Sequence, residues 1–169
     1  MNRAGAIIGS IIFLFVAPGI VAGLIPWMIS QYRMEAPLLG LALLRWVGVL
    51  LLVFGGLLLA ETFARFALQG VGTPAPIAPT KTLVVTGSYR FVRNPMYVGV
   101  VSLILAQGLL FGNAVVLGYG LVVWLTVHSF VLAYEEPTLS TTYGDQYDRY
   151  RANVRRWIPR LTPWSDQAT

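Results

Sequence analysis

Long apolar stretches restrict what this chain can fold into more than any other feature of its sequence. A helix needs roughly 20 apolar residues to cross the hydrocarbon core of a bilayer. Stretches that reach or approach this length lie at residues 4–27, 45–65, 95–111 and 114–134. Charged residues make up 11% of the 169 residues, against about 25% in soluble domains. The sequence therefore predicts one all-α integral membrane domain, residues 1–169, with about four transmembrane helices.

The basic residues predict how these helices are oriented. With four spans, the N-terminus, the loop 66–94 and the tail 135–169 share one side of the membrane. That side carries ten of the twelve basic residues, namely Arg3, Arg65, Lys81, Arg90, Arg93, Arg149, Arg151, Arg155, Arg156 and Arg160. Positive charge is retained in the cytoplasm, so both termini are expected to be cytoplasmic. The net charge of +5 follows from this orientation and from attraction to anionic lipids, and a nucleic-acid partner is not expected.

The residue types exclude several kinds of active site. The chain has no cysteine, which removes thiolate zinc sites and cysteine nucleophiles. Its one histidine, His128, makes a histidine metal cluster or a Ser-His-Asp triad implausible. Within an apolar span, a histidine is more often a hydrogen-bond partner of a neighbouring segment than a catalyst. No metal site is therefore expected.

The two polar segments on the predicted cytoplasmic side differ in character. The loop contains Pro74, Pro76 and Pro79, which exclude a helix there and favour extended backbone. The tail has apolar and aromatic residues at spacings of three and four, namely Tyr143, Tyr147, Tyr150, Val154 and Trp157. This pattern predicts a C-terminal amphipathic helix at the membrane interface or across the end of the bundle.

The third and fourth spans are predicted to form a hairpin that gathers charged residues at its open end. Asn94 suits the N-cap and Pro95 the first turn of the third helix. The hairpin then brings Arg93, Asn94 and Tyr97 to the depth of Glu135 and Glu136. A helix N-terminus favours an anion and a carboxylate favours a cation, so a ligand of mixed charge would fit. Adjacent helical residues diverge by about 100°, so one glutamate is expected to face the ligand and the other to pair with arginine.

Two motifs in this region resemble a known family. Residues 82–99, Thr-Leu-Val-Val-Thr-Gly-Ser-Tyr-Arg-Phe-Val-Arg-Asn-Pro-Met-Tyr-Val-Gly, resemble the pattern G-x-Y-x-x-x-R-[HN]-P-x-Y-x-G. Residues 135–139, Glu-Glu-Pro-Thr-Leu, resemble E-E-x-x-L. Their order and spacing are similar to the isoprenylcysteine carboxyl methyltransferases and the related phospholipid methyltransferases, over about residues 70–159. The resemblance implies a bacterial-type integral membrane methyltransferase, located in the inner membrane, that uses S-adenosylmethionine (SAM).

The resemblance also implies which residues enclose SAM. Its carboxylate suits the helix N-terminus at Asn94 or a nearby arginine, and its ammonium or ribose hydroxyls suit Glu135. Tyr89 and Tyr97 can flank the adenine or the sulfonium. The implied cofactor-binding residues are Lys81, Thr82, Leu83, Val84, Tyr89, Arg93, Asn94, Pro95, Met96, Tyr97 and Glu135.

The acceptor implied by the resemblance is a membrane-resident amphiphile, with either a prenylcysteine-like carboxylate or a phospholipid amine. A carboxylate needs no base because it is already ionised, whereas an amine must first lose a proton. The candidate catalytic residues are therefore Glu136 and Tyr147 for the proton and Arg151 for an acceptor carboxylate. Arg151 is considered because prenylcysteine methyltransferases place an arginine where this chain has Val131. The sequence also has Asn94 where the family more usually has histidine.

Two other functions remain open from the sequence. A NADPH-dependent membrane reductase related to the sterol reductases would share the C-terminal architecture. A non-catalytic membrane scaffold would keep the fold without binding a cofactor. The sequence gives no indication of the oligomeric state.

Overall fold

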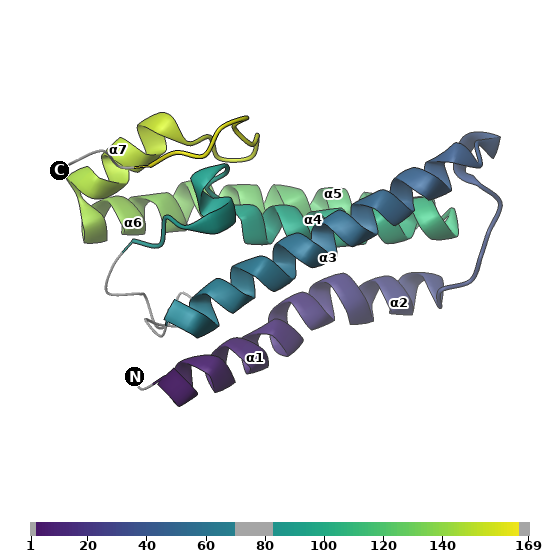
Figure 1. Ribbon diagram of the computed structural model, residues 1–169. Helices are drawn as coiled ribbons and strands as arrows, with labels where there is room; N and C mark the ends of the chain where they lie inside the picture. Colours follow the sequence, from purple (N-terminus) through teal and green to yellow (C-terminus); the bar gives the residue numbers. More distant parts are fainter. Residues whose placement is uncertain (1–2, 70–82, 166–169) are drawn as a thin grey trace.

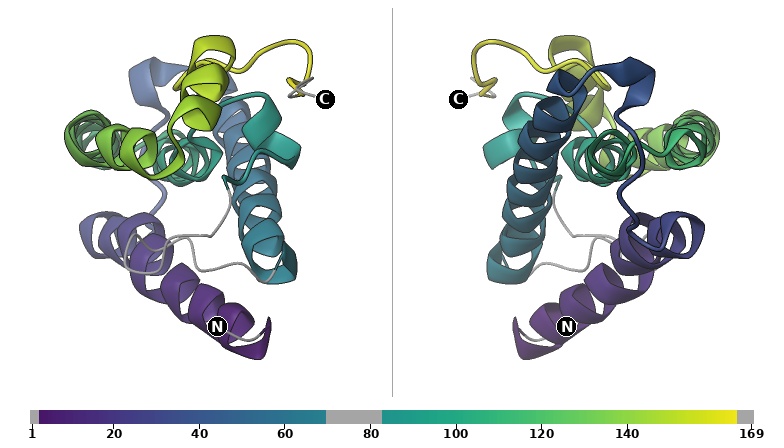
Figure 2. Two further views of the ribbon diagram at one scale, coloured as in Figure 1. Left: turned by 90° about the vertical axis from the view of Figure 1, so that its left-hand side faces the viewer. Right: turned by 90° about the vertical axis from the view of Figure 1, so that its right-hand side faces the viewer.

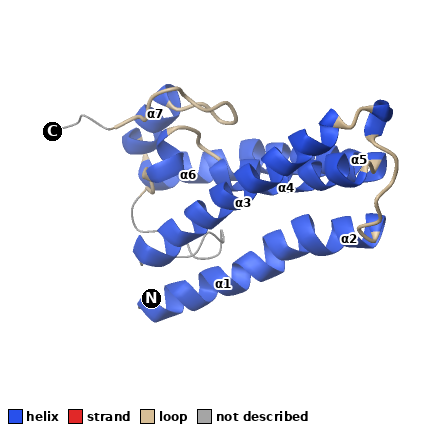
Figure 3. Ribbon diagram, turned by 45° about the vertical axis from the view of Figure 1, so that its right-hand side comes forward, coloured by secondary structure: helices blue, strands red, loops and turns tan. Residues whose placement is uncertain are grey.

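The computed structural model describes residues 3–69 and 83–165, and these fold into helices and connecting loops without a strand (Figures 1 and 3). The first span is one long rod made of α1, a π-helical turn and α2. The elements are α1 (Arg3–Gly19), η1 (Ile20–Leu24), α2 (Ile25–Ser30), η2 (Leu38–Gly40), α3 (Leu43–Gln69), η3 (Gly87–Arg90), α4 (Pro95–Phe111), α5 (Ala114–Phe130), η4 (Val131–Glu135), α6 (Glu136–Tyr143) and α7 (Asp145–Asn153).

All four predicted spans are helical. Three stretches are long and apolar enough to cross a membrane, at Ile11–Ser30, Leu43–Arg65 and Ala114–Tyr143. The remaining span, which is the third in chain order, is α4, a shorter apolar helix of 17 residues. The all-α membrane fold is therefore confirmed. The last stretch runs further than the predicted boundary at residue 134, because the backbone passes through the π-helical turn η4 straight into α6.

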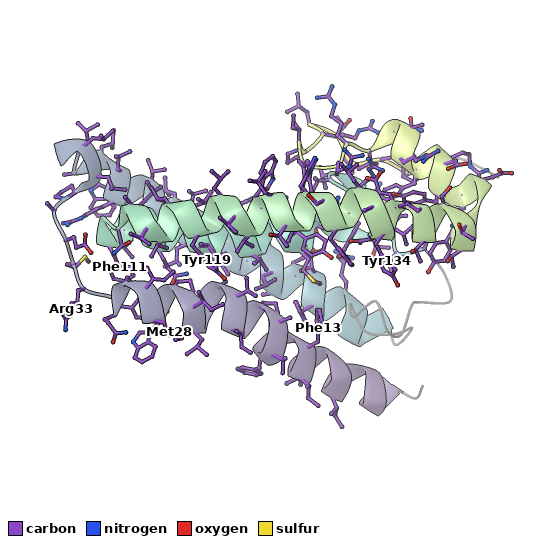
Figure 4. The ribbon with its side chains drawn as sticks, turned by 180° about the vertical axis from the view of Figure 1, so that it is seen from behind. Phe13, Met28, Arg33, Phe111, Tyr119 and Tyr134 are labelled. Atoms are coloured by element: carbon purple, nitrogen blue, oxygen red, sulfur yellow. The ribbon has the colours of Figure 1, made fainter. Side chains whose placement is uncertain are left out.

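The spans form a layer of three helices with the α1–α2 rod against it. Viewed along the helices, α4 lies between α3 and α5 (Figure 2). Pro95 begins α4, as predicted. Gly112 (φ 76°) makes the tight turn into α5, where the Asn113 side chain accepts a hydrogen bond from the Val116 N–H at 3.1 Å. Arg33 and Phe111 lie at one end of the bundle, and Tyr134 lies toward the other end, beside α6 and α7 (Figure 4). The α4–α5 hairpin therefore opens toward the tail.

A π-helical turn in the first span is stabilised by side chains from the hairpin. Gln107 of α4 donates to the Ala22 carbonyl at 2.7 Å, and Tyr119 of α5 donates to the Val21 carbonyl at 2.9 Å. Such carbonyls need partners, because the hydrocarbon core offers no water to satisfy them. These bonds fix the rod against α4 and α5.

Small residues bring α3 and α4 close together. A Cβ atom on Gly55 would lie 2.9 Å from the Gly99 carbonyl oxygen and 3.1 Å from the Ser102 Cβ. Small residues at such positions let helix backbones approach closely in membranes. This contact places the N-terminal end of α4 beside α3.

Substitution of Gly55 by leucine is expected to lower the free energy of unfolding by about 1–3 kcal/mol, because the new side chain overpacks the α3–α4 contact. The thermal midpoint of the detergent-solubilised protein measures the loss. Gly56→Leu is the matched control, because a Cβ there meets no described atom within 4 Å, and its midpoint should stay near wild type. An equal loss in both variants would contradict the close contact at Gly55.

The tail differs from the single amphipathic helix that the residue spacing predicts. Gly144, at φ 50° and ψ −130°, separates α6 from α7, and α7 ends at Asn153, before Val154 and Trp157. The backbone beyond α7 instead bonds to the segment before α4. The N–H groups of Arg93, Arg160 and Trp164 donate to the carbonyls of Arg155, Phe91 and Arg90, each at 2.9 Å. Because these bonds satisfy the backbone, the tail leaves the helix early and crosses the end of the hairpin.

The aromatic stripe of the tail is buried inside the protein. Tyr147, Tyr150 and Val154 form a small core against Leu83 and Val85, which precede η3. Burial raises the pKa of the Tyr147 and Tyr150 phenols above its ordinary value. Both side chains are therefore neutral hydrogen-bonding groups at physiological pH.

Candidate active site

A polar cavity lies at the open end of the α4–α5 hairpin, between the membrane helices and the tail. Its lining combines carboxylates, one guanidinium and several phenols with apolar side chains. The lining residues are Leu83, Val84, Tyr89, Arg93, Asn94, Met96, Tyr97, Glu135, Glu136, Leu139, Tyr143, Tyr147 and Tyr150. The cavity volume is about 120 Å³. We call this the polar cavity below.

Tyr97 and Glu135 connect the two arms of the hairpin within this cavity. Tyr97 lies in the first turn of α4, and its hydroxyl donates to Glu135 Oε2 at 3.0 Å. Glu135 is the last residue of the π-helical turn η4. A π-helical turn adds a residue to the helical repeat and is frequent at functional sites. Here it redirects the side chains that follow α5 toward the start of α4.

Glu136 forms ion pairs with two arginines, Arg93 and Arg156. Arg156 of the tail binds it through both oxygens, with Nε 2.6 Å from Oε1 and Nη2 2.9 Å from Oε2. Arg93 approaches from before α4, with Nη2 3.2 Å from Oε1. The other terminal nitrogen of Arg93 donates to the Tyr147 hydroxyl at 3.2 Å. The prediction that the adjacent glutamates diverge, one of them pairing with arginine, is confirmed.

The segment before α4 supplies a further wall of the cavity. Gly87 has φ 56°, and a Cβ there would collide with the Arg65 and Glu61 side chains. Glu61 of α3 accepts hydrogen bonds from Ser88 and Arg65, which fixes η3 against α3. Desolvation raises the pKa of the neighbouring Tyr89 phenol well above its ordinary value, so Tyr89 presents a neutral aromatic ring to the cavity.

Asn94 links the cavity wall to the tail. It precedes Pro95 as predicted, but its side chain makes no capping bond. Its amide Nδ2 donates instead to the Arg156 carbonyl at 3.2 Å. The residue that stands where histidine is more usual therefore helps to fix the tail across the hairpin.

A model of a known family matches the part of the chain that builds most of this cavity. The phospholipid methyltransferase model matches residues 43–146, which is more than half of the 169 residues. The chain belongs to the phospholipid methyltransferase family. The match begins with α3, so the family likeness reaches further toward the N-terminus than the motifs at residues 70–159 indicate. The resemblance predicted from those motifs is confirmed.

Two individual proteins are also similar to this chain. It is 40% identical over 80 residues to the protein-S-isoprenylcysteine O-methyltransferase of Schizosaccharomyces pombe, covering 47% of this chain and 34% of that protein. It is 35% identical over 63 residues to an uncharacterized protein of Haemophilus influenzae, covering 37% of this chain and 100% of that protein. The chain thus spans about a third of the length of the yeast enzyme.

The structure brings most of the predicted site residues together. Those that line the polar cavity are Leu83, Val84, Tyr89, Arg93, Asn94, Met96, Tyr97, Glu135, Glu136 and Tyr147. Pro95 is buried at the start of α4 but is not part of the lining. Lys81 and Thr82 lie outside the described residues. Arg151 is exposed, and its Nε lies 3.1 Å from Oδ1 of Asp148, so the structure does not bring it to the cavity.

Sequence reasoning missed three lining residues, Leu139, Tyr143 and Tyr150. Leu139 is the last position of the E-E-x-x-L motif, so the motif itself contained the signal. Tyr143 and Tyr150 belong to the aromatic stripe, which was interpreted as one face of an amphipathic helix at the membrane interface or across the end of the bundle. Their position against the hairpin depends on the Gly144 break, which residue spacing does not show.

Proposed function

We propose that the protein is a SAM-dependent methyltransferase that acts on a membrane-resident amphiphile at the cytoplasmic face. The observation that carries the proposal is the contact between Tyr97 and Glu135 in a polar cavity at the membrane boundary. Membership of the phospholipid methyltransferase family favours methyl transfer over NADPH-dependent reduction or a scaffold role.

The chemistry of the cavity suits SAM. Bound SAM would supply a methyl group from its positively charged sulfonium. Glu135 would hold the cofactor's ammonium, while Arg93 and the N-terminus of α4 would attract its carboxylate. Tyr89 and Tyr97 offer aromatic faces to the adenine or sulfonium. Lys81 and Thr82 remain proposed cofactor contacts.

The size of the cavity indicates that it opens when a ligand binds. Its volume of about 120 Å³ is below the roughly 300–1,000 Å³ of typical small-molecule pockets. The lining includes Leu83, Val84 and Met96, whose side chains make no hydrogen bonds that would have to break. We therefore propose that the lining side chains separate to admit the cofactor.

The contacts of Glu136 and Tyr147 change the roles that we propose for them. Glu136 binds Arg93 and Arg156, and Tyr147 accepts from Arg93. These bonds favour a role in positioning the cavity wall over a role in accepting a proton. Glu135, which accepts a hydrogen bond from the Tyr97 hydroxyl and pairs with no arginine among the described residues, is the better candidate to hold the charge of an ammonium. Arg151 is exposed and pairs with Asp148, so its proposed role toward an acceptor carboxylate has less support than the role of Arg93 toward the cofactor.

The arrangement of the helices supports a cytoplasmic site, and we propose a bacterial inner membrane from the family resemblance alone. The start of α1 lies at the same end of the molecule as α6 and α7 (Figure 1). The arginines of α7 and of the segment around η3 gather at that end. Because positive segments are retained in the cytoplasm, we propose that this end, with both termini, faces the cytoplasm.

Methyl-labelled SAM tests the proposal. Incubation of the purified protein with SAM and a membrane lipid extract is expected to label one lipid fraction. A phospholipid amine and a synthetic prenylcysteine, added separately, distinguish the two acceptor classes. Calorimetric titration with S-adenosylhomocysteine should show binding in the absence of any acceptor. Binding of NADPH alone would support the reductase, and binding of neither compound with no labelled lipid would support the scaffold.

A further inference from the structure

A second cavity lies between α4 and α5, on the part of the hairpin that crosses the membrane. Its volume is about 380 Å³, within the range of small-molecule pockets. Apolar side chains dominate its walls, among them Val98, Val101 and Leu105 from α4 and Leu121 and Trp124 from α5. We call this cavity the lateral groove. Because the surrounding medium is lipid, a hydrocarbon chain is the natural occupant.

Tyr97 lines both the lateral groove and the polar cavity. Its ring is therefore shared by an apolar space within the membrane and a charged space at the membrane boundary. A molecule that fits both spaces has a hydrocarbon chain and a polar head group, and its head would lie in the polar cavity beside Tyr97. Because Tyr97 borders both cavities, together they suit an amphiphile.

One wall of the lateral groove comes from the tail rather than from a membrane helix. Trp157 lies beyond the end of α7, and its indole Nε1 donates to His128 Nδ1 of α5 at 2.9 Å. The His128 ring also stacks on Trp124, with ring centroids 5.3 Å apart, and lies 5.9 Å from the Trp157 ring.

The backbone beside Trp157 is fixed as well. The carbonyl of Arg156 accepts from Asn94, and the carbonyl of Arg155 accepts from the Arg93 N–H. The Trp157 side chain is therefore held from the tail side by the backbone and from the membrane side by His128.

We propose that the lateral groove holds the hydrocarbon chain of the acceptor and that Trp157, positioned by His128, determines which chains fit. This inference rests on the proposed function, because it assigns a site to the acceptor of the same reaction. The tail that carries Trp157 bonds to the segment before α4, so we expect the indole to border the groove near the end where the chain would join its head group. An unbranched chain would pack against the Trp157 indole, whereas a chain that is branched next to the head group would clash with it.

Photocrosslinking tests the inference without SAM. The probe is a long-chain alkylamine that carries a diazirine on its chain, and mass spectrometry locates the attachment. Attachment is expected to concentrate at residues 98–105 and 121–124. Trp157→Ala should reduce attachment there about tenfold, the effect of losing one aromatic contact. Trp46→Ala is the matched control, because Trp46 lies on α3 with 68% of its surface exposed, and it should leave the pattern unchanged.

Two further variants separate a specific role of Trp157 from a general loss of structure. Trp157→Phe keeps an aromatic ring without the N–H group, and His128→Leu removes the acceptor. Both should keep the wild-type thermal midpoint within a few degrees, yet relax the preference for an unbranched over a branched probe. His128→Asn, which retains a hydrogen-bond acceptor, should restore part of that preference.

The inference and the proposed function fail in different ways. Attachment spread evenly over the lipid-facing sides of α3 and α5, or unaltered in Trp157→Ala, would overturn the inference even if methyl transfer is found. Attachment in the lateral groove without SAM-dependent labelling would leave the chain site in place and overturn the proposed reaction.

Discussion

Replacement of Glu135 by glutamine is expected to weaken S-adenosylhomocysteine binding by about 10- to 150-fold. A hydrogen bond to a charged group is worth about 1.5–3 kcal/mol, and each 1.4 kcal/mol corresponds to a factor of ten. Glutamine keeps the size of the side chain and an oxygen for the Tyr97 hydroxyl, so the variant removes the charge with little change of shape. Calorimetric titration of the purified variant measures the change.

Thr138→Ala is the matched control for this variant. Thr138 lies one turn further along, on α6, where its exposed hydroxyl bonds the Tyr134 carbonyl of its own helix at 2.7 Å. The control should bind S-adenosylhomocysteine as tightly as wild type. Unchanged affinity in Glu135→Gln would remove this carboxylate from the proposed cofactor site, and equal losses in both variants would indicate damage to the helix.

Replacement of Glu136 by glutamine is expected to destabilise the protein by about 3–5 kcal/mol, because it leaves the largely buried guanidinium group of Arg93, and the half-buried one of Arg156, without their counter-charge. The Glu136 and Arg93 side chains are only 14% and 10% exposed. Arg156 connects the same carboxylate to the tail, so the tail should also become accessible. Unfolding in detergent measures the first effect, and limited proteolysis after α7 measures the second.

Asp148→Asn provides the comparison for the ion pair. It removes the partner of Arg151, but both side chains of that pair are 47% exposed. Exposed ion pairs contribute about 0–1 kcal/mol, so this variant should unfold close to wild type and keep its tail protected. If Glu136→Gln were as stable as Asp148→Asn, the buried pairs would not be what fixes the tail.

The membrane fold could be predicted from the sequence because its causes are local. Each apolar stretch must become a helix in a bilayer, where backbone groups have no water to bond. The start of α4 at Pro95 followed from the fixed φ angle of proline, which suits the first turn of a helix in any context. The hairpin that carries the candidate site was therefore predictable, and with it the proximity of Tyr97 and Glu135.

The path of the tail could not be predicted in the same way. Residues at spacings of three and four, from Tyr143 to Trp157, indicate a continuous helix. The structure ends that helix at Asn153, because the following backbone finds its hydrogen bonds on the segment at residues 90–93. The helical preference of the tail was overridden by hydrogen-bond partners 62 to 74 residues away in the chain, and no residue pattern within the tail indicates those partners.

The sequence by itself determined the spans, the hairpin, the family motifs and the divergence of the two glutamates, because helical geometry and hydrophobicity act between neighbouring residues. The tertiary structure alone decided which glutamate pairs with arginine, that Arg151 pairs with Asp148 and does not line the cavity, and that Trp157 bonds His128. These features depend on the π-helical turn η4 and on the tail crossing the hairpin. In both places, buried polar groups form hydrogen bonds or ion pairs with groups that are distant in the chain. Burying such a group without a partner would cost free energy in a low-dielectric interior.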